Sequence, residues 1–408
     1  SQVAQYLHSP LLILGAWVLG ALISLLGVLC YAELSSRHPE TGGTYVFLRE
    51  AYGKFIGFMY GWSEFSINRA ASIAAVAYIF AAYLRHLLPY SRSEEKWVAV
   101  LAIIILTLVN MFGVRLGVRV QHLLSSFKVI AILGVSGLIF WFSGSGALRR
   151  LLEGHAAIES GGLSEWAPAL IPILWTYGGW HESTFMAGEF RDTRRELPLA
   201  LIVSALIVAF LYLGLNAAYL CVVPPVEMAK SDAIAASALG KLFGPAGSVV
   251  ITVAVLLSAS GALNSTVLTG GRIPFSVAQD SPGLSWFGRV DPRFKTPLRS
   301  LALNGAWASV LVLWGSFEQL LFLTAFEIWF FFILAGLSVL ILRGRAPTRS
   351  HFSMMGYPAV PILFTLVSAW LCFTTIQHAP REALFGFLII LVGVPVYFLV
   401  RRPLGSAR

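Results

Sequence analysis

Charged side chains are scarce in this chain. Asp, Glu, Lys and Arg make up 12% of its 408 residues, whereas 57% are hydrophobic. A soluble protein of this length needs a charged, hydrated surface, so the composition argues against one. The apolar runs recur at the length that crosses a bilayer, and 28 Phe and 12 Trp suit lipid-facing and interfacial surfaces. The chain is therefore expected to be an all-α polytopic membrane protein.

Cysteine is also rare, and the sequence lacks the common enzyme motifs. Cys30, Cys221 and Cys372 form no C-x-x-C pair and lie in or beside apolar runs, so we interpret them as packing residues rather than disulfide partners or metal ligands. No Walker, H-E-x-x-H or G-x-S-x-G motif occurs in a workable context, and Gly42-Gly43 lacks the Lys-Ser/Thr that follows in a phosphate loop. These absences argue against an enzyme, a metal and any other cofactor.

Eleven apolar segments are candidates for membrane-spanning helices. They cover residues 11–34, 54–84, 97–113, 120–142, 168–189, 198–222, 243–271, 299–315, 318–342, 357–377 and 383–400. The longest loops, about 143–167 and 272–298, are too short to fold alone. Residues 1–408 are therefore expected to form a single transmembrane domain.

The basic residues indicate how the chain is oriented. Although the net charge is +9, the cations lie in short loops between apolar runs, which argues against nucleic acid binding. Nineteen of the 29 lysines and arginines fall on the side of the C-terminus and eight on the other, which predicts a cytoplasmic C-terminus. Eleven spans then place Ser1 outside, and no cleavable signal peptide is visible. We expect that one N-terminal helix is missing; the alternative is one span divided or overlooked.

The span 168–189 has the features of a binding site. Gly178-Gly179 lies at mid-span and His181 and Glu182 follow, which is unfavourable for a continuous helix. Broken helices occur within membranes where they line a cavity, and their freed carbonyls and helix ends bind charged substrate groups. A close helix crossing that needs small residues is the alternative. The neighbouring His181 and Glu182 favour the site.

Two further polar positions allow two interpretations each. Lys128 lies about one-third of the way into its span, so its ammonium either has an internal role or extends to the inner surface. Asn264-Ser265-Thr266 either line a path or pack helices together, and packing is slightly favoured.

Carboxylates inside spans are expensive to bury and are therefore candidates for function. Glu64 and Asn68 share a helix face at i, i+4, whereas Arg69 is expected to point elsewhere. Inter-helix hydrogen bonds and an ion pair are the favoured role for this group. Glu327 is either a proton site or the partner of an intramembrane cation such as Arg69.

Motifs along nearly the whole chain resemble those of the amino acid–polyamine–organocation (APC) permeases, in particular their L-type amino acid transporter branch. The motifs are Cys30-Tyr-Ala-Glu33-Leu with Pro39-Glu-Thr-Gly42-Gly43-Thr-Tyr45, Trp175-Thr-Tyr-Gly178-Gly179-Trp180 with Glu189 and Leu197-Pro198-Leu-Ala200, and Asn264-Ser-Thr-Val-Leu-Thr-Gly-Gly-Arg272 with Pro292-Arg-Phe-Lys-Thr-Pro297. The resemblance implies a LeuT-type inverted-repeat fold of twelve helices. The eleven spans would be helices two to twelve, without the first helix and its Gly-Ser-Gly stretch for the substrate carboxylate.

The resemblance also implies roles for individual residues. Carbonyls of Trp175, Thr176 and Gly178 would accept from the substrate ammonium, and the Trp175 ring would be an aromatic gate. His181 stands where many L-type members have Asn. The expected substrate-binding residues are Trp175, Thr176, Tyr177, Gly178, Gly179, His181 and Ser125. Lys128 matches a fifth-helix lysine whose ammonium occupies the place of a sodium ion, which argues against sodium coupling.

We therefore expect a secondary active transporter of amino acids, most simply neutral ones, that works by alternating access through exchange or proton coupling. Its expected partners are the amino acid and the lipid bilayer. Loop 85–96 has no Cys for a disulfide-linked heavy chain, which favours a free-standing transporter of the bacterial inner membrane. The alternatives are a carrier of polyamines or cationic amino acids, with Glu182 or Glu327 as the cation partner, and a permease-like protein that binds without transporting.

Overall fold

The computed structural model describes residues 1–111, 114–144, 163–271, 277–278, 281–294, 296–345 and 351–400, and the secondary structure in these ranges is helical. The helices are α1 (Gln2–Tyr6), α2 (Pro10–Arg37), α3 (Thr44–Tyr52), α4 (Lys54–Ser63), η1 (Glu64–Arg69), α5 (Ala70–Leu84), α6 (Glu95–Met111), α7 (Val114–Ser143), α9 (Leu163–Tyr177), η2 (Trp180–Glu189), α10 (Thr193–Val222), α11 (Pro225–Lys230), α12 (Ile234–Gly270), η3 (Pro282–Leu284), α14 (Leu298–Trp314), α15 (Phe317–Arg345), α16 (Ala359–His378) and α17 (Pro380–Val400).

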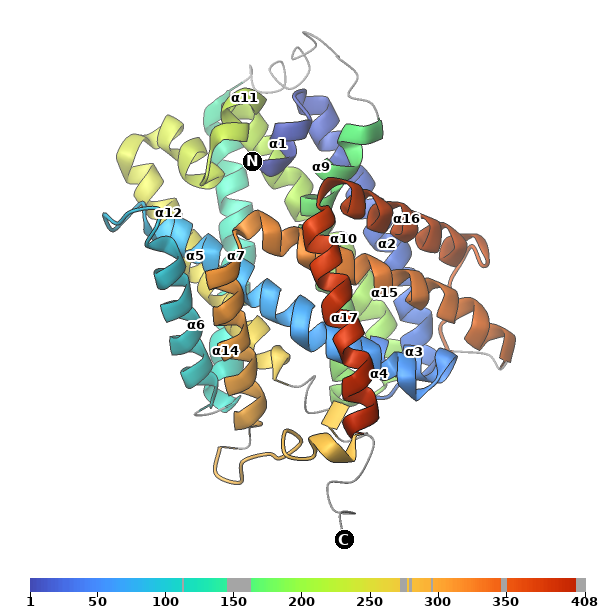
Figure 1. Ribbon diagram of the computed structural model, residues 1–408. Helices are drawn as coiled ribbons and strands as arrows, with labels where there is room; N and C mark the ends of the chain where they lie inside the picture. Colours follow the sequence, from blue (N-terminus) through green and yellow to red (C-terminus); the bar gives the residue numbers. More distant parts are fainter. Residues whose placement is uncertain are drawn as a thin grey trace.

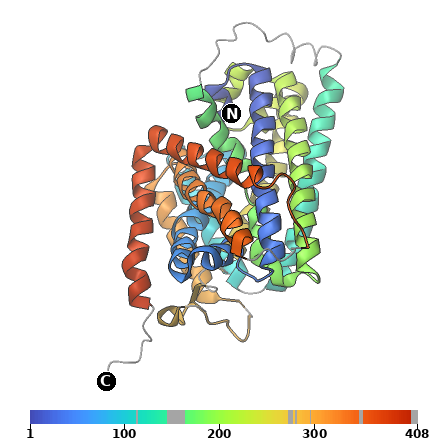
Figure 2. The ribbon, with the colours of Figure 1, turned by 90° about the vertical axis from the view of Figure 1, so that its right-hand side faces the viewer.

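Within the described residues each predicted span is helical, and span 168–189 is divided between α9 and η2. Eight stretches there are long and apolar enough to cross a membrane, and α14 is a shorter apolar helix. The N-terminus, beside α1 and α11, and the C-terminal end of α17 lie at opposite ends of the bundle (Figure 1; Figure 2). This arrangement agrees with the predicted alternation of the loops, although the number of membrane crossings stays a prediction.

The helices differ in tilt, and the tilted ones surround the centre. In Figure 1, α15 and the continuous stretch α4–η1–α5 run obliquely through the bundle, whereas α17 runs along it. The helix α2 packs against α9, α10 and α16, and α15 packs against α5 and α16. Interior side chains of α2 and α15 are almost all apolar or small, as close packing without water requires.

Two local irregularities have clear sequence causes. In α12 the backbone of Gly244 is left-handed (φ 65°) and Pro245 follows, so an amphipathic entry segment bends there into the apolar span. Between α4 and α5 the helix is wound as a π-helix over Glu64–Arg69. Such π-segments interrupt α-helices mainly at functional sites.

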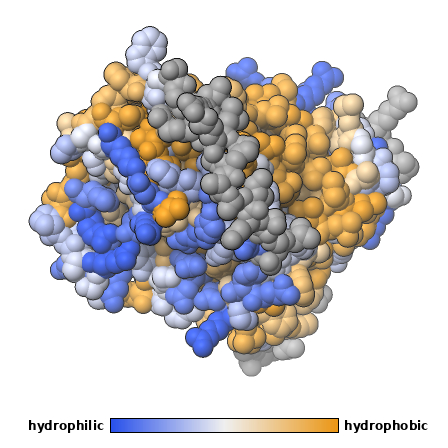
Figure 3. All heavy atoms as spheres, turned by 90° about the horizontal axis from the view of Figure 1, so that it is seen from above, coloured by the Kyte–Doolittle hydropathy of each residue, from blue (hydrophilic) through white to orange (hydrophobic). Residues whose placement is uncertain are grey.

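The end of the molecule beside α1 and α11 carries paired charges. Arg85 Nε lies 2.9 Å from Glu95 Oε1, and Arg92 Nη2 lies 2.6 Å from Asp232 Oδ2. Figure 3 looks onto this end and shows hydrophilic residues gathered on one side of it. Helix ends that carry charge above apolar flanks are expected where a bundle leaves the membrane.

Candidate functional site

The predicted break in span 168–189 is present. The helix α9 ends at Tyr177, Gly178-Gly179 forms a turn, and the chain continues as the 3-10 helix η2. Gly179 has φ 91°, a left-handed conformation that favours glycine. A Cβ added to Gly178 would lie 2.9 Å from the Trp175 carbonyl oxygen. Both glycines are therefore required by the local backbone.

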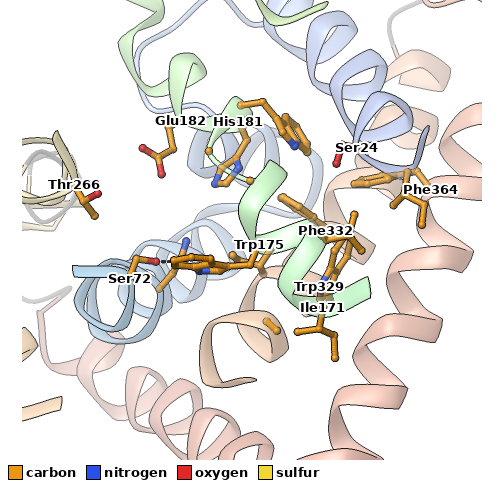
Figure 4. A pocket seen from close by; sticks show the side chains of 18 of the residues that line it. Ser24, Ser72, Ile171, Trp175, His181, Glu182, Thr266, Trp329, Phe332 and Phe364 are labelled. Carbon is orange, nitrogen blue, oxygen red and sulfur yellow. Dashed lines mark hydrogen bonds between the residues drawn. The ribbon is translucent and has the colours of Figure 1, made fainter. Parts of the chain in front are cut away.

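A cavity of about 150 Å³ lies against this break. Its polar lining residues are Ser24, Asn68, Ser72, His181, Glu182 and Thr266, and its aromatic ones are Trp175, Trp180, Trp329, Phe332 and Phe364. Figure 4 shows Ser72, Glu182 and Thr266 on one side of the cavity, and Trp329, Phe332 and Phe364 on the other. A ligand with one polar and one apolar side would match this division.

Backbone groups at the break face this cavity. Gly178 and Gly179 are exposed and line it. The last carbonyls of an α-helix have no partner within the helix and carry the negative end of its dipole. Here the Gly178 N–H donates to the Trp175 carbonyl (3.1 Å). Such an end suits a cationic group, for example an ammonium.

A buried network of charges connects the break to the π-segment. Arg69 Nε donates to Glu64 Oε1 (2.8 Å), and Arg69 Nη1 lies 2.8 Å from Glu182 Oε1. The side chains of Arg69 and Glu64 are each 1% exposed, and that of Glu182 is 33% exposed. Glu64 Oε2 also accepts from Tyr60 (3.1 Å) and Asn68 (2.9 Å).

The expectation that Arg69 points away from Glu64 was wrong. It assumed an α-helix, in which residues five apart lie on different faces. The π-helical winding of η1 hydrogen-bonds positions i and i+5, and this brings Arg69 over Glu64. The predicted contact between Glu64 and Asn68 is present.

Comparison with known proteins decides the family. The sequence profile of the family described as amino acid permease matches residues 3–398. The chain belongs to this family. Family membership confirms the APC resemblance and the LeuT-type, all-helical membrane fold.

The permease is similar to characterised transporters along almost all of its length. It is 29% identical to the serine/threonine exchanger SteT of Bacillus subtilis, over 98% of this chain and 91% of that protein. It is 30% identical to the human b(0,+)-type amino acid transporter 1, over 94% of this chain and 79% of that protein, and 30% identical to the human Asc-type amino acid transporter 1, over 97% and 77%. The permease is therefore an integral membrane protein that transports amino acids, and it is not an enzyme.

The structure brings most of the predicted substrate residues to one cavity. Trp175, Gly178, Gly179 and His181 line it, and so does Glu182, which was predicted as a proton or structural site. His181 is buried, and its Nδ1 has no hydrogen-bond partner within the described part of the permease.

The side chains of Thr176 and Tyr177 lie elsewhere. Thr176 borders a second cavity, of about 500 Å³, near α1 and α11, and its hydroxyl donates to the Pro172 carbonyl (2.7 Å). The Tyr177 hydroxyl donates to the Trp17 carbonyl (3.2 Å), so this side chain packs against α2. The Trp175 ring lines both cavities and therefore lies between them.

Of the two predicted residues of the fifth family helix, only Lys128 has a described side chain. The side chain of Ser125 lies outside the described residues. Lys128 lies on α7, is partly buried, and lines neither of the two cavities above.

Glu327 and Asn264 contact neighbouring helices. Glu327 is fully buried; Oε1 accepts from Ser63 (3.0 Å), and Oε2 has no partner among the described residues. Among those residues Arg69 forms its ion pairs with Glu64 and Glu182, so the alternative that pairs Glu327 with Arg69 is not realised. Asn264 Oδ1 accepts from Asn110 (2.7 Å) and joins α12 to α6, in line with the packing interpretation.

The sequence did not predict the aromatic side of the cavity or the residue that α2 contributes to its lining. Ser24 comes from α2, Trp329 and Phe332 from α15, and Phe364 from α16. These helices are apolar on all sides, so no periodicity distinguishes a cavity-facing aromatic from a packed or lipid-facing one. The Glu327 neighbourhood was the one available signal that α15 approaches the centre.

Proposed function

We propose that this permease is a sodium-independent exchanger of neutral amino acids that works by alternating access. The observation that carries the proposal is the break at Gly178-Gly179, which exposes backbone to a cavity with a polar and an aromatic side. A relative of matching length is named a serine/threonine exchanger, which supports exchange as the mode of transport. Broken helices at the membrane midplane are the usual substrate sites of such transporters.

In the proposed binding mode the substrate ammonium contacts the carbonyl end of α9, at Trp175, Thr176 and Gly178. The substrate side chain extends between the polar and aromatic sides. His181 Nδ1, buried and without a partner among the described residues, is then available for a substrate hydroxyl or other polar group. The Trp175 ring, which separates the two cavities, acts as the gate on the side of α1.

The charges around the cavity support a neutral substrate over a cationic one. A cationic side chain would need an available carboxylate, but Glu64 and Glu182 are already bound to Arg69. Glu327 is fully buried and does not line the cavity. It remains our candidate for a proton site, because Oε2 has no partner in the described part of the chain.

Sodium independence and topology rest on the sequence. Lys128 supports sodium independence, because the family resemblance assigns its ammonium to the place of a sodium ion. The excess of cations in the loops on the C-terminal side supports a cytoplasmic C-terminus. We propose residence in a bacterial inner membrane without a disulfide-linked heavy chain, since loop 85–96 has no Cys.

Transport in proteoliposomes tests the proposal, using the protein together with any sequence that precedes Ser1 in its reading frame. Vesicles are loaded with unlabelled serine, alanine, leucine, arginine or putrescine, and uptake of the labelled compound is measured with and without sodium and proton gradients. The expected result is saturable uptake of a neutral amino acid that requires internal substrate and is unchanged without sodium. If only arginine or putrescine is taken up, the proposal of a neutral substrate is wrong. If no compound shows saturable flux, the proposal that the protein is a transporter is refuted.

A further inference from the structure

The ion pair between Arg69 and Glu182 joins the broken segment to the oblique stretch α4–η1–α5. Glu182 lies in the first turn of η2, three residues after the left-handed Gly179, and Arg69 lies where η1 meets α5. Besides the 2.8 Å contact with Glu182, Arg69 Nη1 donates to Thr269 on α12 (3.3 Å), and the guanidinium lies over the Phe185 ring (5.7 Å). We propose that the Arg69–Glu182 ion pair is a latch that holds η2 against η1 and keeps the cytoplasmic side of the substrate site closed. The inference rests on the proposed alternating-access function.

Arg69 can release Glu182 without becoming an unpaired buried charge. Its Nε is bound to Glu64 at 2.8 Å, and both of these side chains are almost fully buried. A lone buried guanidinium is unstable, whereas a paired one is tolerated. Because Glu64 remains in place, the buried pair stays neutral when Glu182 leaves. Because Glu64 stays bound to Arg69, the contact between Arg69 and Glu182 can break and form again.

Glu182 is the member of the network that is able to move. It borders the cavity and is one-third exposed, so water reaches it when the segment shifts. Its helix η2 is a 3-10 helix of 10 residues. Runs of 3-10 helix longer than three or four residues are uncommon, and such stretches often mark hinges. The Gly178-Gly179 turn directly precedes it.

The direction of opening follows from the chain path. The helix η2 continues into α10, whose first turns carry the cations Arg194 and Arg195 that the charge bias assigns to the cytoplasm. Displacing η2 from η1 therefore opens the cavity towards that side. With the latch intact, the empty permease opens rarely and substrate binding offsets the loss of the ion pair. This favours exchange over net efflux.

The first experiment compares net efflux with exchange in proteoliposomes, at saturating substrate. Glu182→Gln keeps the shape of the side chain and removes its charge. Because charge-assisted hydrogen bonds are about twice as strong as neutral ones, the ratio of net efflux to exchange is expected to rise roughly fivefold. Glu196→Gln, an exposed carboxylate in the first turn of α10, is the matched control and should leave the ratio unchanged. An unchanged ratio in Glu182→Gln overturns the latch.

The second experiment measures opening directly and does not depend on transport. A cysteine at Thr266, which lines the cavity, is labelled from the cytoplasmic side with a membrane-impermeant thiol reagent; the three natural cysteines are buried. The labelling rate is expected to rise roughly fivefold in the Glu182→Gln background, by the same loss of a charge-assisted contact. Equal rates in both backgrounds refute the latch. If the parent protein transports no compound while Glu182→Gln still accelerates labelling, the proposed function fails and the latch stands.

Discussion

Replacing Arg69 by methionine should lower the stability of the permease more than removing one partner of a surface ion pair. Arg69 and Glu64 are each 1% exposed, so the substitution leaves Glu64 as an uncompensated buried carboxylate. Removing one partner of a buried ion pair costs about 3–5 kcal/mol. The matched control is Arg92→Met: Arg92 and its partner Asp232 are 69% and 48% exposed, and such pairs contribute about 0–1 kcal/mol.

A thiol-reactive dye offers a suitable assay, because all three cysteines are buried and become reactive only on unfolding. The unfolding entropy scales with the length of the chain, 408 residues. The stability lost in Arg69→Met therefore corresponds to an apparent melting temperature lowered by roughly 3–6 °C. The double variant Arg69→Met, Glu64→Gln removes both charges, and most of the loss should be recovered. A double variant no more stable than Arg69→Met, or an Arg69→Met effect as small as that of Arg92→Met, would refute the reasoning.

Three further predictions concern transport. Gly179→Ala places a Cβ on a residue with φ 91°, at a cost of about 1–2 kcal/mol. Counterflow of the labelled amino acid should therefore fall roughly tenfold. Counterflow at the wild-type rate would show that this turn is not needed for transport. Trp175→Leu removes the ring between the two cavities, so KM for the substrate should rise at least about tenfold, and an unchanged KM would exclude Trp175 from the gate. Lys128→Ala should reduce exchange roughly tenfold at an unchanged melting temperature, and exchange as fast as that of the parent protein would count against an internal role for Lys128.

Three buried polar atoms without partners belong to residues of the candidate site or of the charge network beside it. Among the described residues they include Arg69 Nη2, His181 Nδ1 and Glu327 Oε2. Each such atom costs about 1–3 kcal/mol when it is left unsatisfied. A membrane protein gains nothing in stability from this arrangement. It is consistent with a site that keeps polar groups available for substrate, protons or water.

Much of the architecture was predictable from the sequence, because apolar runs in a membrane leave the backbone few options. A segment in hydrocarbon must satisfy its hydrogen bonds internally, so each long apolar run indicates a helix. The break at Gly178-Gly179 was predictable for a related reason: two glycines and the polar residues after them are incompatible with a continuous apolar helix.

The partners of the charged residues were not predictable from the sequence. Arg69 reaches Glu64 because η1 is wound as a π-helix, and the local sequence gives no sign of that winding. It reaches Glu182 because the tilt of α5 brings together residues more than a hundred positions apart. Such contacts depend on how the helices cross, which hydropathy does not encode.

The aromatic side of the cavity also shows what the sequence predicts and what depends on the tertiary structure. The sequence by itself determined that the chain is a bundle of apolar helices with a broken segment at its centre, because burial in lipid and helix propensity act locally. Only the tertiary structure decided which aromatic rings of α15 and α16 face that segment. In a helix that is apolar on every side, the choice between cavity, neighbour and lipid depends on packing alone.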